Sequence, residues 1–259
     1  MPSQSTLATS LRQLHIPGKP IILTNVYDAV SARAVAALPA TQALATASYA
    51  VAASAGISDD DMTLETNLAA IRGVSTVAKE FGLPLTVDWQ DGYGRRLEEG
   101  VGKILDLGVV GVNLEDCDKE TQKMLPIDIA SERVKKVLNI ARTRGISDFV
   151  VNARTDILIH GGAISDAIVR GKSYLDAGAT TVFVWGGSNR GGITETEVVE
   201  LTRAFDGRLN VALKVDPGNL TAKDLANIGV ARLSIGPTLQ VKAMRFLSEE
   251  AEKVLSRRN

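Results

Sequence analysis

The sequence predicts an α/β protein that forms a single (β/α)8 barrel of the TIM type. Three observations support this fold: a chain of 259 residues, a structural unit that recurs along it, and a glycine that precedes most of the predicted strands. In the unit, an amphipathic segment ends in glycine, a few residues follow, and a short β-branched run then finishes on polar side chains. With two strand-helix units that lack the glycine, the chain has eight units in about 250 residues, which is typical of a closed barrel.

The first two units lie at the start of the chain. PIILTNVYD predicts a strand that leads into a helix from about Ala29, and TQALATASY predicts a second strand, followed by SAGISDDD and a helix from about Leu64. Asp28 directly precedes the first of these helices, and an aspartate there is typical of an N-cap.

Six further units carry the glycine signature. They are KEFGLPLTVD, LDLGVVGVNLED, ARTRGISDFVVNARTD, LDAGATTVFVWGG, AFDGRLNVALKVD and ANIGVARLSIGP, with glycines at positions 82, 108, 145, 178, 207 and 229. Each glycine is predicted to end a helix, where a positive φ costs it little. The apolar runs that follow are continuous, as in parallel strands buried on both faces. An open doubly wound sheet is the alternative, but it usually has a glycine fingerprint after its first strand, where this chain has NVYDAVSA.

The whole chain, residues 1–259, is predicted to be one domain, with a short N-terminal helix before the barrel and a C-terminal helix after it. The final segment, TLQVKAMRFLSEEAEKVLSRRN, has apolar residues at roughly helical spacing.

Composition excludes several classes of partner. A formal charge of −1 gives no broad basic field for nucleic acid or an anionic membrane. No signal-peptide core and no uninterrupted apolar run of about 18 residues occurs, so we expect a soluble protein. A single cysteine, Cys117, allows no intramolecular disulfide and fits a reducing compartment. The cytoplasm is the expected location, with an organelle as the alternative.

In a barrel, the C-terminal ends of the strands meet at one mouth, where function resides. The polar residues predicted there are Asn25, Tyr27 and Asp28; Ala47, Ser48 and Tyr49; Asp88, Gln90 and Asp91; Glu115 and Asp116; Asn152, Arg154 and Asp156; Trp185; Lys214 and Asp216; and Ser234. Carboxylates that close would repel one another, and a divalent cation would relieve this. Oxygen ligands without clustered His or Cys favour Mg²⁺, or Mn²⁺, over zinc. For the stretch LTVDWQDGYGRRL, a phosphate site and a plain structural turn are the alternatives.

Five motifs also resemble a known family. NVYDAVSA, ATASYAVAASAGISDDD, VDWQDGYG, GVNLED and VNARTD, in this order and at these distances, resemble the isocitrate lyase / phosphoenolpyruvate mutase superfamily over about residues 20 to 237. The resemblance implies a modified (β/α)8 barrel, commonly a homotetramer. It also implies that Mg²⁺ holds a 2-oxo or 2-hydroxy carboxylate while a C–C or P–C bond is broken or made.

The resemblance assigns roles to seven residues. These are Asp88 and Glu115 for the metal; Ala47, Ser48, Tyr49 and Arg154 for the substrate; and Asp59 and Arg154 for catalysis. Structural roles are the alternatives. The metal-site carboxylates could accept hydrogen bonds from turn amides, Asp59 could cap a helix, Tyr49 could pack in the barrel, and Arg154 could form salt bridges with Asp156 or Glu115.

Departures from the superfamily pattern narrow the predicted activity. The loop after the Glu-Asp strand, CDKETQKMLPID, lacks both the Lys-Lys/Arg-Cys-Gly-His signature of isocitrate and methylisocitrate lyases and the Lys-x-Asn of true mutases. Gln90 stands where the family usually has the second aspartate of Asp-x-Asp. Cys117 is predicted as a buried small apolar residue rather than a nucleophile, and His160 as a surface or loop residue rather than an acid or base.

The sequence therefore predicts a Mg²⁺-dependent C–C lyase, decarboxylase or hydrolase of the oxaloacetate type, acting through a metal-stabilised enolate. P–C chemistry on phosphonopyruvate or phosphoenolpyruvate is one alternative. A barrel without catalysis, serving as a carboxylate-binding or assembly protein, is the alternative from another class. A homo-oligomer, commonly a tetramer in the superfamily, is expected. Relatives often exchange a late helix between subunits, and here this exchange is expected to be reduced or absent.

Overall fold

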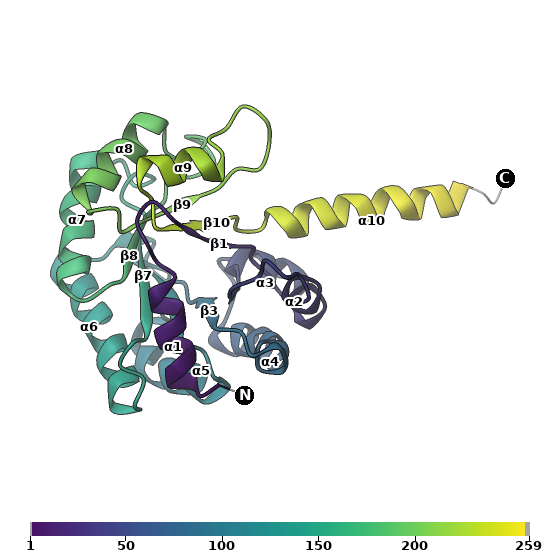
Figure 1. Cartoon of the computed structure of the whole chain (residues 1–259), viewed down its shortest axis with the longest axis horizontal. Coiled ribbons are helices and arrows are strands. Elements are labelled where there is room, and N and C mark those ends of the chain that lie inside the picture. Colours follow the sequence, from purple (N-terminus) through teal and green to yellow (C-terminus); the bar gives the residue numbers. More distant parts are fainter. Residues whose placement is uncertain (1, 257–259) are drawn as a thin grey trace.

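A computed structural model describes residues 2–256 and shows an eight-stranded parallel barrel, as predicted (Figure 1). The hydrogen-bonded order of the strands is β1-β10-β9-β8-β7-β4-β3-β2. The barrel closes between β1 and β2 through a parallel bridge from Val26 to Thr46, in which the Val26 N–H donates to the Ala45 carbonyl over 2.8 Å.

The barrel strands are β1 (Ile21–Leu23), β2 (Leu44–Ala45), β3 (Leu85–Asp88), β4 (Gly111–Glu115), β7 (Val150–Thr155), β8 (Thr181–Val184), β9 (Leu209–Ala212) and β10 (Arg232–Ser234). The helices are α1 (Gln4–Gln13), α2 (Ala29–Ala36), α3 (Ser48–Ser54), α4 (Leu64–Phe81), α5 (Leu97–Leu107), α6 (Ile127–Thr143), α7 (Ile164–Asp176), α8 (Glu195–Ala204), α9 (Ala222–Ile228) and α10 (Thr238–Ser256). A 3₁₀ turn, η1 (Gly94–Arg96), precedes α5, and β5 (Cys117–Asp118) pairs with β6 (Lys123–Met124) in a separate antiparallel hairpin.

The predicted helix boundaries are confirmed where glycine and aspartate mark them. All six signature glycines have positive φ, for example 64° at Gly82 and 106° at Gly229, and each lies at or just beyond the end of a helix. Asp28 caps α2: its carboxylate accepts from the Ser31 N–H over 2.7 Å, and the Ser31 hydroxyl oxygen accepts from the Asp28 N–H. Local chemistry thus sets where these helices begin and end.

Helix α1 packs against the barrel at the end opposite the predicted mouth. The Gln4 side chain donates to the carbonyl of Leu105, in the last turn of α5, and to that of Val109, two residues before β4 begins. Leu11 is fully buried and lies where a Cβ on Gly111, the first residue of β4, would meet it at 3.1 Å. The N-terminal ends of the strands are therefore covered.

Two elements differ from the predicted units. The second strand was expected to run through Ser48 and Tyr49, but β2 ends at Ala45 and α3 begins at Ser48, with Ala47 as an extended N-cap residue. The β5–β6 hairpin lies between β4 and α6, where the sequence indicated only a loop. Both elements lie near the strand ends that carry the predicted site. Within residues 2–256, no helix combines the length and the apolar character needed to cross a bilayer.

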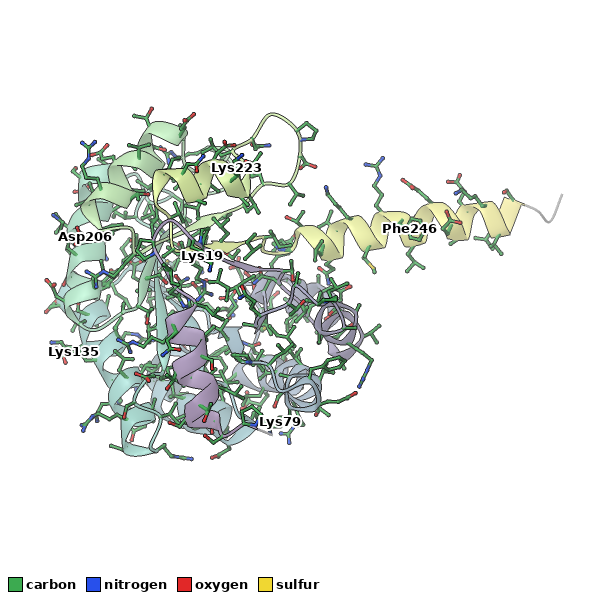
Figure 2. The ribbon with its side chains drawn as sticks, viewed as in Figure 1. Lys19, Lys79, Lys135, Asp206, Lys223 and Phe246 are labelled. Atoms are coloured by element: carbon green, nitrogen blue, oxygen red, sulfur yellow. The ribbon has the colours of Figure 1, made fainter. Side chains whose placement is uncertain are left out.

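Helix α10 leaves the barrel and projects away from it (Figure 1). Only Gln240 of this helix is buried; its side chain donates to the Ala50 carbonyl over 2.7 Å. Phe246 is 64% exposed and lies on the projecting part of the helix (Figure 2). Other exposed apolar residues on the helix are Val241, Met244, Leu247, Val254 and Leu255. An exposed apolar stripe of this kind is typical of an interaction surface.

We predict that the protein is a homo-oligomer, most simply a tetramer, in which a neighbouring subunit covers α10. Light scattering at micromolar concentration should give a mass several times that of the chain. Phe246→Glu combined with Leu247→Glu should shift the protein toward monomer, because each change would bury a charge in the contact. Glu252→Gln, on the same helix, serves as the control and should not change the mass. A monomeric wild-type protein would refute the prediction.

Candidate active site

A cavity of about 750 Å³ opens at the C-terminal ends of the barrel strands. Side chains from all eight barrel strands or the segments that follow them line it. Six of the seven predicted site residues are among these: Ala47, Ser48, Tyr49, Asp59, Asp88 and Arg154. Glu115, the seventh, does not line the cavity but contacts Arg154, which does. The structure therefore brings the predicted residues together in one place.

Asp88 ends β3 and is held from several sides. One carboxylate oxygen, Oδ2, accepts from the Ser48 N–H over 2.8 Å, and Oδ1 accepts from Asn113 Nδ2 over 2.9 Å. The Asp88 N–H donates to the Thr46 hydroxyl, and its carbonyl accepts from Asn67. Donors on both carboxylate oxygens fix the side chain and stabilise its negative charge.

The hydrogen bond from Asn113 is the last in a row that crosses the barrel interior. The Thr181 hydroxyl on β8 donates to Asn152 Oδ1 over 2.7 Å, and Asn152 Nδ2 on β7 donates to Asn113 Oδ1 over 2.7 Å. Asn113 on β4 then donates to Asp88. We call Thr181, Asn152 and Asn113 the amide row. Every donor in it is directed toward Asp88, and all three side chains are buried.

Asp59, in the segment between α3 and α4, is linked to two residues outside the cavity lining. Gln90 Nε2 donates to Asp59 Oδ1 over 3.0 Å, and Gln90 Oε1 accepts from Lys119 Nζ over 2.8 Å. Burial and the nearby charge of Asp88 raise the pKa of Asp59, while a hydrogen bond from the Ser48 side chain opposes the shift. Asp59 is therefore suited to carry a proton next to the cavity. No helix-capping bond to it is observed; Thr63 caps α4.

Lys119 was not predicted as a site residue. It lies in the β5–β6 hairpin, and burial lowers its pKa while Asp59 and Asp91 oppose the shift. Gln90 has a φ of 46° and so turns back to place its amide between Asp59 and Lys119. Asp91 does not compensate for the missing aspartate at position 90, because its Oδ1 accepts from the Tyr93 N–H and so serves the turn. Lys119 is far from Asp59 in the sequence, so no local pattern indicated that it would lie at the site.

Arg154, on β7, forms both salt bridges that were considered as alternatives. Its Nη1 lies 2.8 Å from Glu115 Oε1, and its Nε and Nη2 bind Asp156 at 2.7 and 3.0 Å. The guanidinium also lies over the Trp185 ring, 5.2 Å from its centroid. Burial alone would lower the pKa of Arg154, but the charges of Asp156 and Glu115 outweigh it and raise the pKa. These contacts use three of its five N–H groups, so one on each terminal nitrogen is left for a ligand.

Asp116 takes no part in the cavity, although it follows Glu115 directly. Its Oδ2 accepts from the Tyr174 hydroxyl over 2.6 Å and from Arg170 over 3.0 Å, and its Oδ1 accepts from the Asp156 N–H. Alternation along the chain directs the two neighbours to opposite sides. Asp116 therefore anchors α7 to the end of β7.

The carboxylates fit a hard divalent cation. Burial raises the pKa of Glu115 well above its usual value; Arg154 opposes this, and the charges of Asp156, Asp88 and Asp59 add to it. Carboxylates that raise one another's pKa gain from a shared cation. Among residues 2–256, no three His, Cys, Asp or Glu side chains are arranged to hold a metal by themselves. Mg²⁺ needs fewer, since it usually takes one or two carboxylates and keeps several waters.

Two of the three residues after β2 that were predicted to bind the substrate carboxylate use their backbone N–H groups within the protein instead. The Ala47 N–H donates to the Val26 carbonyl in the barrel closure, and the Ser48 N–H donates to Asp88. Tyr49 is 56% exposed at the cavity, so it is not barrel packing. Its N–H lies in the first turn of α3, where backbone donors have no partner within the helix. A role for Tyr49 in substrate binding therefore remains a prediction.

Cys117 and His160 lie together, which the sequence did not indicate. Cys117 Sγ is 3.4 Å from His160 Nε2, and neither residue lines the cavity. The thiol is half-buried. Burial, together with the charges of Asp156 and Asp116, raises its pKa to about 12, so it is a thiol and not a thiolate at neutral pH. A thiol with this pKa is a poor nucleophile.

We predict that Cys117→Ser retains more than about half of the wild-type kcat/KM, because the hydroxyl can replace the thiol beside His160 and no reacting group needs the sulfur. Steady-state assays on the substrate found for the wild-type protein would test this. His160→Gln is the matched variant and should behave alike. A loss of about a thousandfold in either variant would show that the pair takes part in the chemistry.

The fold and site together define a barrel enzyme whose cavity gathers carboxylates and a guanidinium at the strand C-terminal ends. A family model described as phosphoenolpyruvate phosphomutase matches residues 11–255. The chain therefore belongs to this family, within the isocitrate lyase / phosphoenolpyruvate mutase superfamily, whose members are lyases and mutases.

Individual proteins are similar to this chain over most of its length. The chain is 32% identical over 233 residues to an uncharacterised protein of Mycobacterium tuberculosis. The aligned residues cover 88% of this chain and 81% of the relative. A crystal structure of a Burkholderia cenocepacia J2315 protein is 30% identical with a TM-score of 0.86, covering 97% of this chain and 99% of that one. The crystal structure of 2,3-dimethylmalate lyase is 25% identical with a TM-score of 0.84, covering 100% and 89%.

Proposed function

We propose that the protein is a Mg²⁺-dependent enzyme that cleaves a C–C bond of a small 2-oxo carboxylate of the oxaloacetate type, as a lyase, decarboxylase or hydrolase. The observation that carries the proposal is the convergence of Asp88, Asp59 and Arg154 on one cavity, with Glu115 bound to Arg154. This set offers oxygen ligands for the cation and a positive charge for the substrate.

Asp88 would hold the cation, and Glu115 would join it directly or through water. When bound, Mg²⁺ supplies an electrophile for the negative charge that develops on the 2-oxo oxygen. Mn²⁺ would serve the same role.

The chain's own residues then orient the substrate and manage a proton. Arg154 is held by Glu115 and Asp156, so its remaining N–H groups have a fixed direction toward a substrate carboxylate. Fixing a reactant in this way lowers the entropic cost of reaching the transition state. Asp59, with its raised pKa, can hold a proton beside the reacting carbon. The Gln90 amide keeps the Asp59 carboxylate in place.

A second candidate function is P–C bond chemistry on phosphonopyruvate or phosphoenolpyruvate. The family model that matches the chain is itself described as phosphoenolpyruvate phosphomutase, which favours this reaction class. The cavity is also large enough for a phosphonate, since it exceeds the volume of a small diacid several-fold.

A substrate screen separates these functions. Purified protein with Mg²⁺ would be incubated with 2-oxo and 2-hydroxy diacids, phosphonopyruvate and phosphoenolpyruvate, and the products would be followed by NMR of ¹³C and ³¹P. C–C cleavage gives a pyruvyl, oxalate or glyoxylate product, and mutase activity moves the phosphorus signal. In parallel, calorimetry would measure binding of pyruvate or oxalate with Mg²⁺. Binding without turnover of any compound would contradict the proposed function and indicate a carboxylate-binding protein instead.

A further inference from the structure

Arg232 is a buried cation on the inner wall of the barrel. It lies on β10 two residues before Ser234, so both side chains point to the same side of the strand, and both line the cavity. Its exposed fraction is 3%. Burial lowers its pKa to about 10, with the charge of Asp88 opposing the shift, so the guanidinium remains charged at neutral pH.

This charge has no ionic partner among residues 2–256. Nη1 lies 3.5 Å from His15 Nε2, and Nε has no hydrogen-bond partner. His15 Nδ1 lies 2.8 Å from the Leu11 carbonyl, to which it must donate, so Nε2 can only accept. Burial and the charge of Arg232 lower the pKa of His15 to about 3, so the imidazole is neutral. The partner of Arg232 is therefore an uncharged acceptor at the limit of hydrogen-bond distance.

Two other buried arginines show the usual arrangement. Arg154 pairs with Glu115 and Asp156, and Arg170 pairs with Asp116 over 3.0 Å. Buried charges are normally paired in this way, because an unpaired ion loses its hydration without compensation. Arg232 departs from this rule inside a cavity, where a ligand rather than a side chain can supply the missing charge.

A second buried polar group without a partner lines the same cavity, on another strand of the barrel. The Thr86 hydroxyl on β3 is buried, has no hydrogen-bond partner among the described residues, and lines the cavity. It lies two residues before Asp88, on the same side of the strand. Buried donors without partners typically mark an ion or an ordered water that the protein side chains do not replace.

We propose that the cavity binds one compact monovalent anion between β10 and β3, with Arg232 supplying the charge and the Thr86 hydroxyl a second donor. A single guanidinium balances one negative charge. A dianion would leave an excess negative charge in an interior that already contains Asp88. Two sources share this chemistry: a free halide, and a carboxylate of a molecule bound in the cavity. The site needs neither Mg²⁺ nor turnover, so it stands apart from the proposed catalytic function.

The test is thermal unfolding of the metal-free protein at constant ionic strength, with chloride or bromide replacing gluconate, a much less compact anion. The wild-type Tm should rise saturably by about 5 °C, because only the folded state has the site. Arg232→Met should unfold about 3 °C higher than wild type in gluconate, since it removes an unpaired buried charge, and should not respond to halide. Arg33→Met, at an exposed salt bridge, is the control and should keep the halide response.

Replacing halide with pyruvate or oxaloacetate separates the two sources. A response to halide identifies a free ion, and a response to a carboxylate alone identifies a bound molecule; both support the proposal if Arg232→Met removes them. If that variant does not fold, Arg232→Lys and Thr86→Val carry the test, each with a loss of anion affinity of about tenfold. No response in the wild-type protein to any of these anions, or equal responses in wild type and variants, would overturn the proposal.

Discussion

Asp88→Ala is expected to abolish both divalent-metal binding and catalysis, with a loss in kcat of about a thousandfold or more. Asp88 is the carboxylate that lines the cavity with donors on both oxygens, so no neighbouring side chain can take over its position. Asp88→Asn should be nearly as harmful. Its amide would turn a donor toward either the Ser48 N–H or the Asn113 side chain, both of which are donors themselves.

Two measurements check this expectation independently. Mn²⁺ titration followed by electron paramagnetic resonance reports metal affinity without any substrate, and steady-state assays report turnover. Asp60→Asn, an exposed carboxylate beside Asp59, is the matched control and should leave both values near wild type. Removal of the metal by EDTA should reproduce the loss in the wild-type enzyme. Full turnover with metal removal verified would refute a role for the cation and for Asp88 as its ligand.

Oxalate is expected to inhibit competitively when Mg²⁺ is present, and isocitrate and methylisocitrate are expected not to be cleaved. Oxalate is a planar mimic of the pyruvate enolate, so a site that stabilises this enolate should bind it more tightly than the substrate, by about a hundredfold. Cleavage of isocitrate needs a base at the 2-hydroxyl and an acid for the carbanion that leaves. The hairpin β5–β6 brings no such acid into the cavity, since Cys117 lies outside its lining.

Steady-state kinetics with these compounds decides the bond assignment. Oxalate should raise the apparent KM for the substrate without changing kcat. In a direct binding measurement, the Asp88→Ala protein should no longer bind oxalate. Malonate, which cannot adopt the planar enolate geometry, is the control compound and should inhibit far less. Efficient isocitrate cleavage, or no inhibition by millimolar oxalate, would contradict the enolate intermediate.

The barrel could be predicted from the sequence because its signals are local. A glycine with positive φ lies at or just beyond the end of each helix from α4 to α9, and a continuous apolar run marks most of the buried strands. These features depend on residues a few positions apart. The same is true of Asp28, whose capping role follows from the residue that stands three positions later.

The contacts within the site were less predictable because they depend on strand register and on distant loops. Asn113 and Asn152 meet because β4 and β7 pair at that height, which no periodicity in the chain specifies. Lys119 reaches Gln90 only because a hairpin folds back over the turn after β3. The charge of Arg232 is visible in the sequence, but its lack of a partner is a property of the closed barrel. Residue type thus indicated which side chains lie at the cavity better than it indicated their contacts there.

The amide row also has a mechanical consequence for the barrel. It joins β8, β7, β4 and β3, four consecutive strands, through buried side-chain bonds of 2.7 to 2.9 Å, and such a network stiffens the wall that contains it. Across β9 and β10, Asn210 and Ser234 meet only at 3.3 to 3.4 Å. Buried side-chain bonds therefore cross-link the half of the barrel that carries Asp88 more tightly than the half that carries Arg232. A molecule in the cavity would meet Asp88 on the tightly linked half and Arg232 on the other.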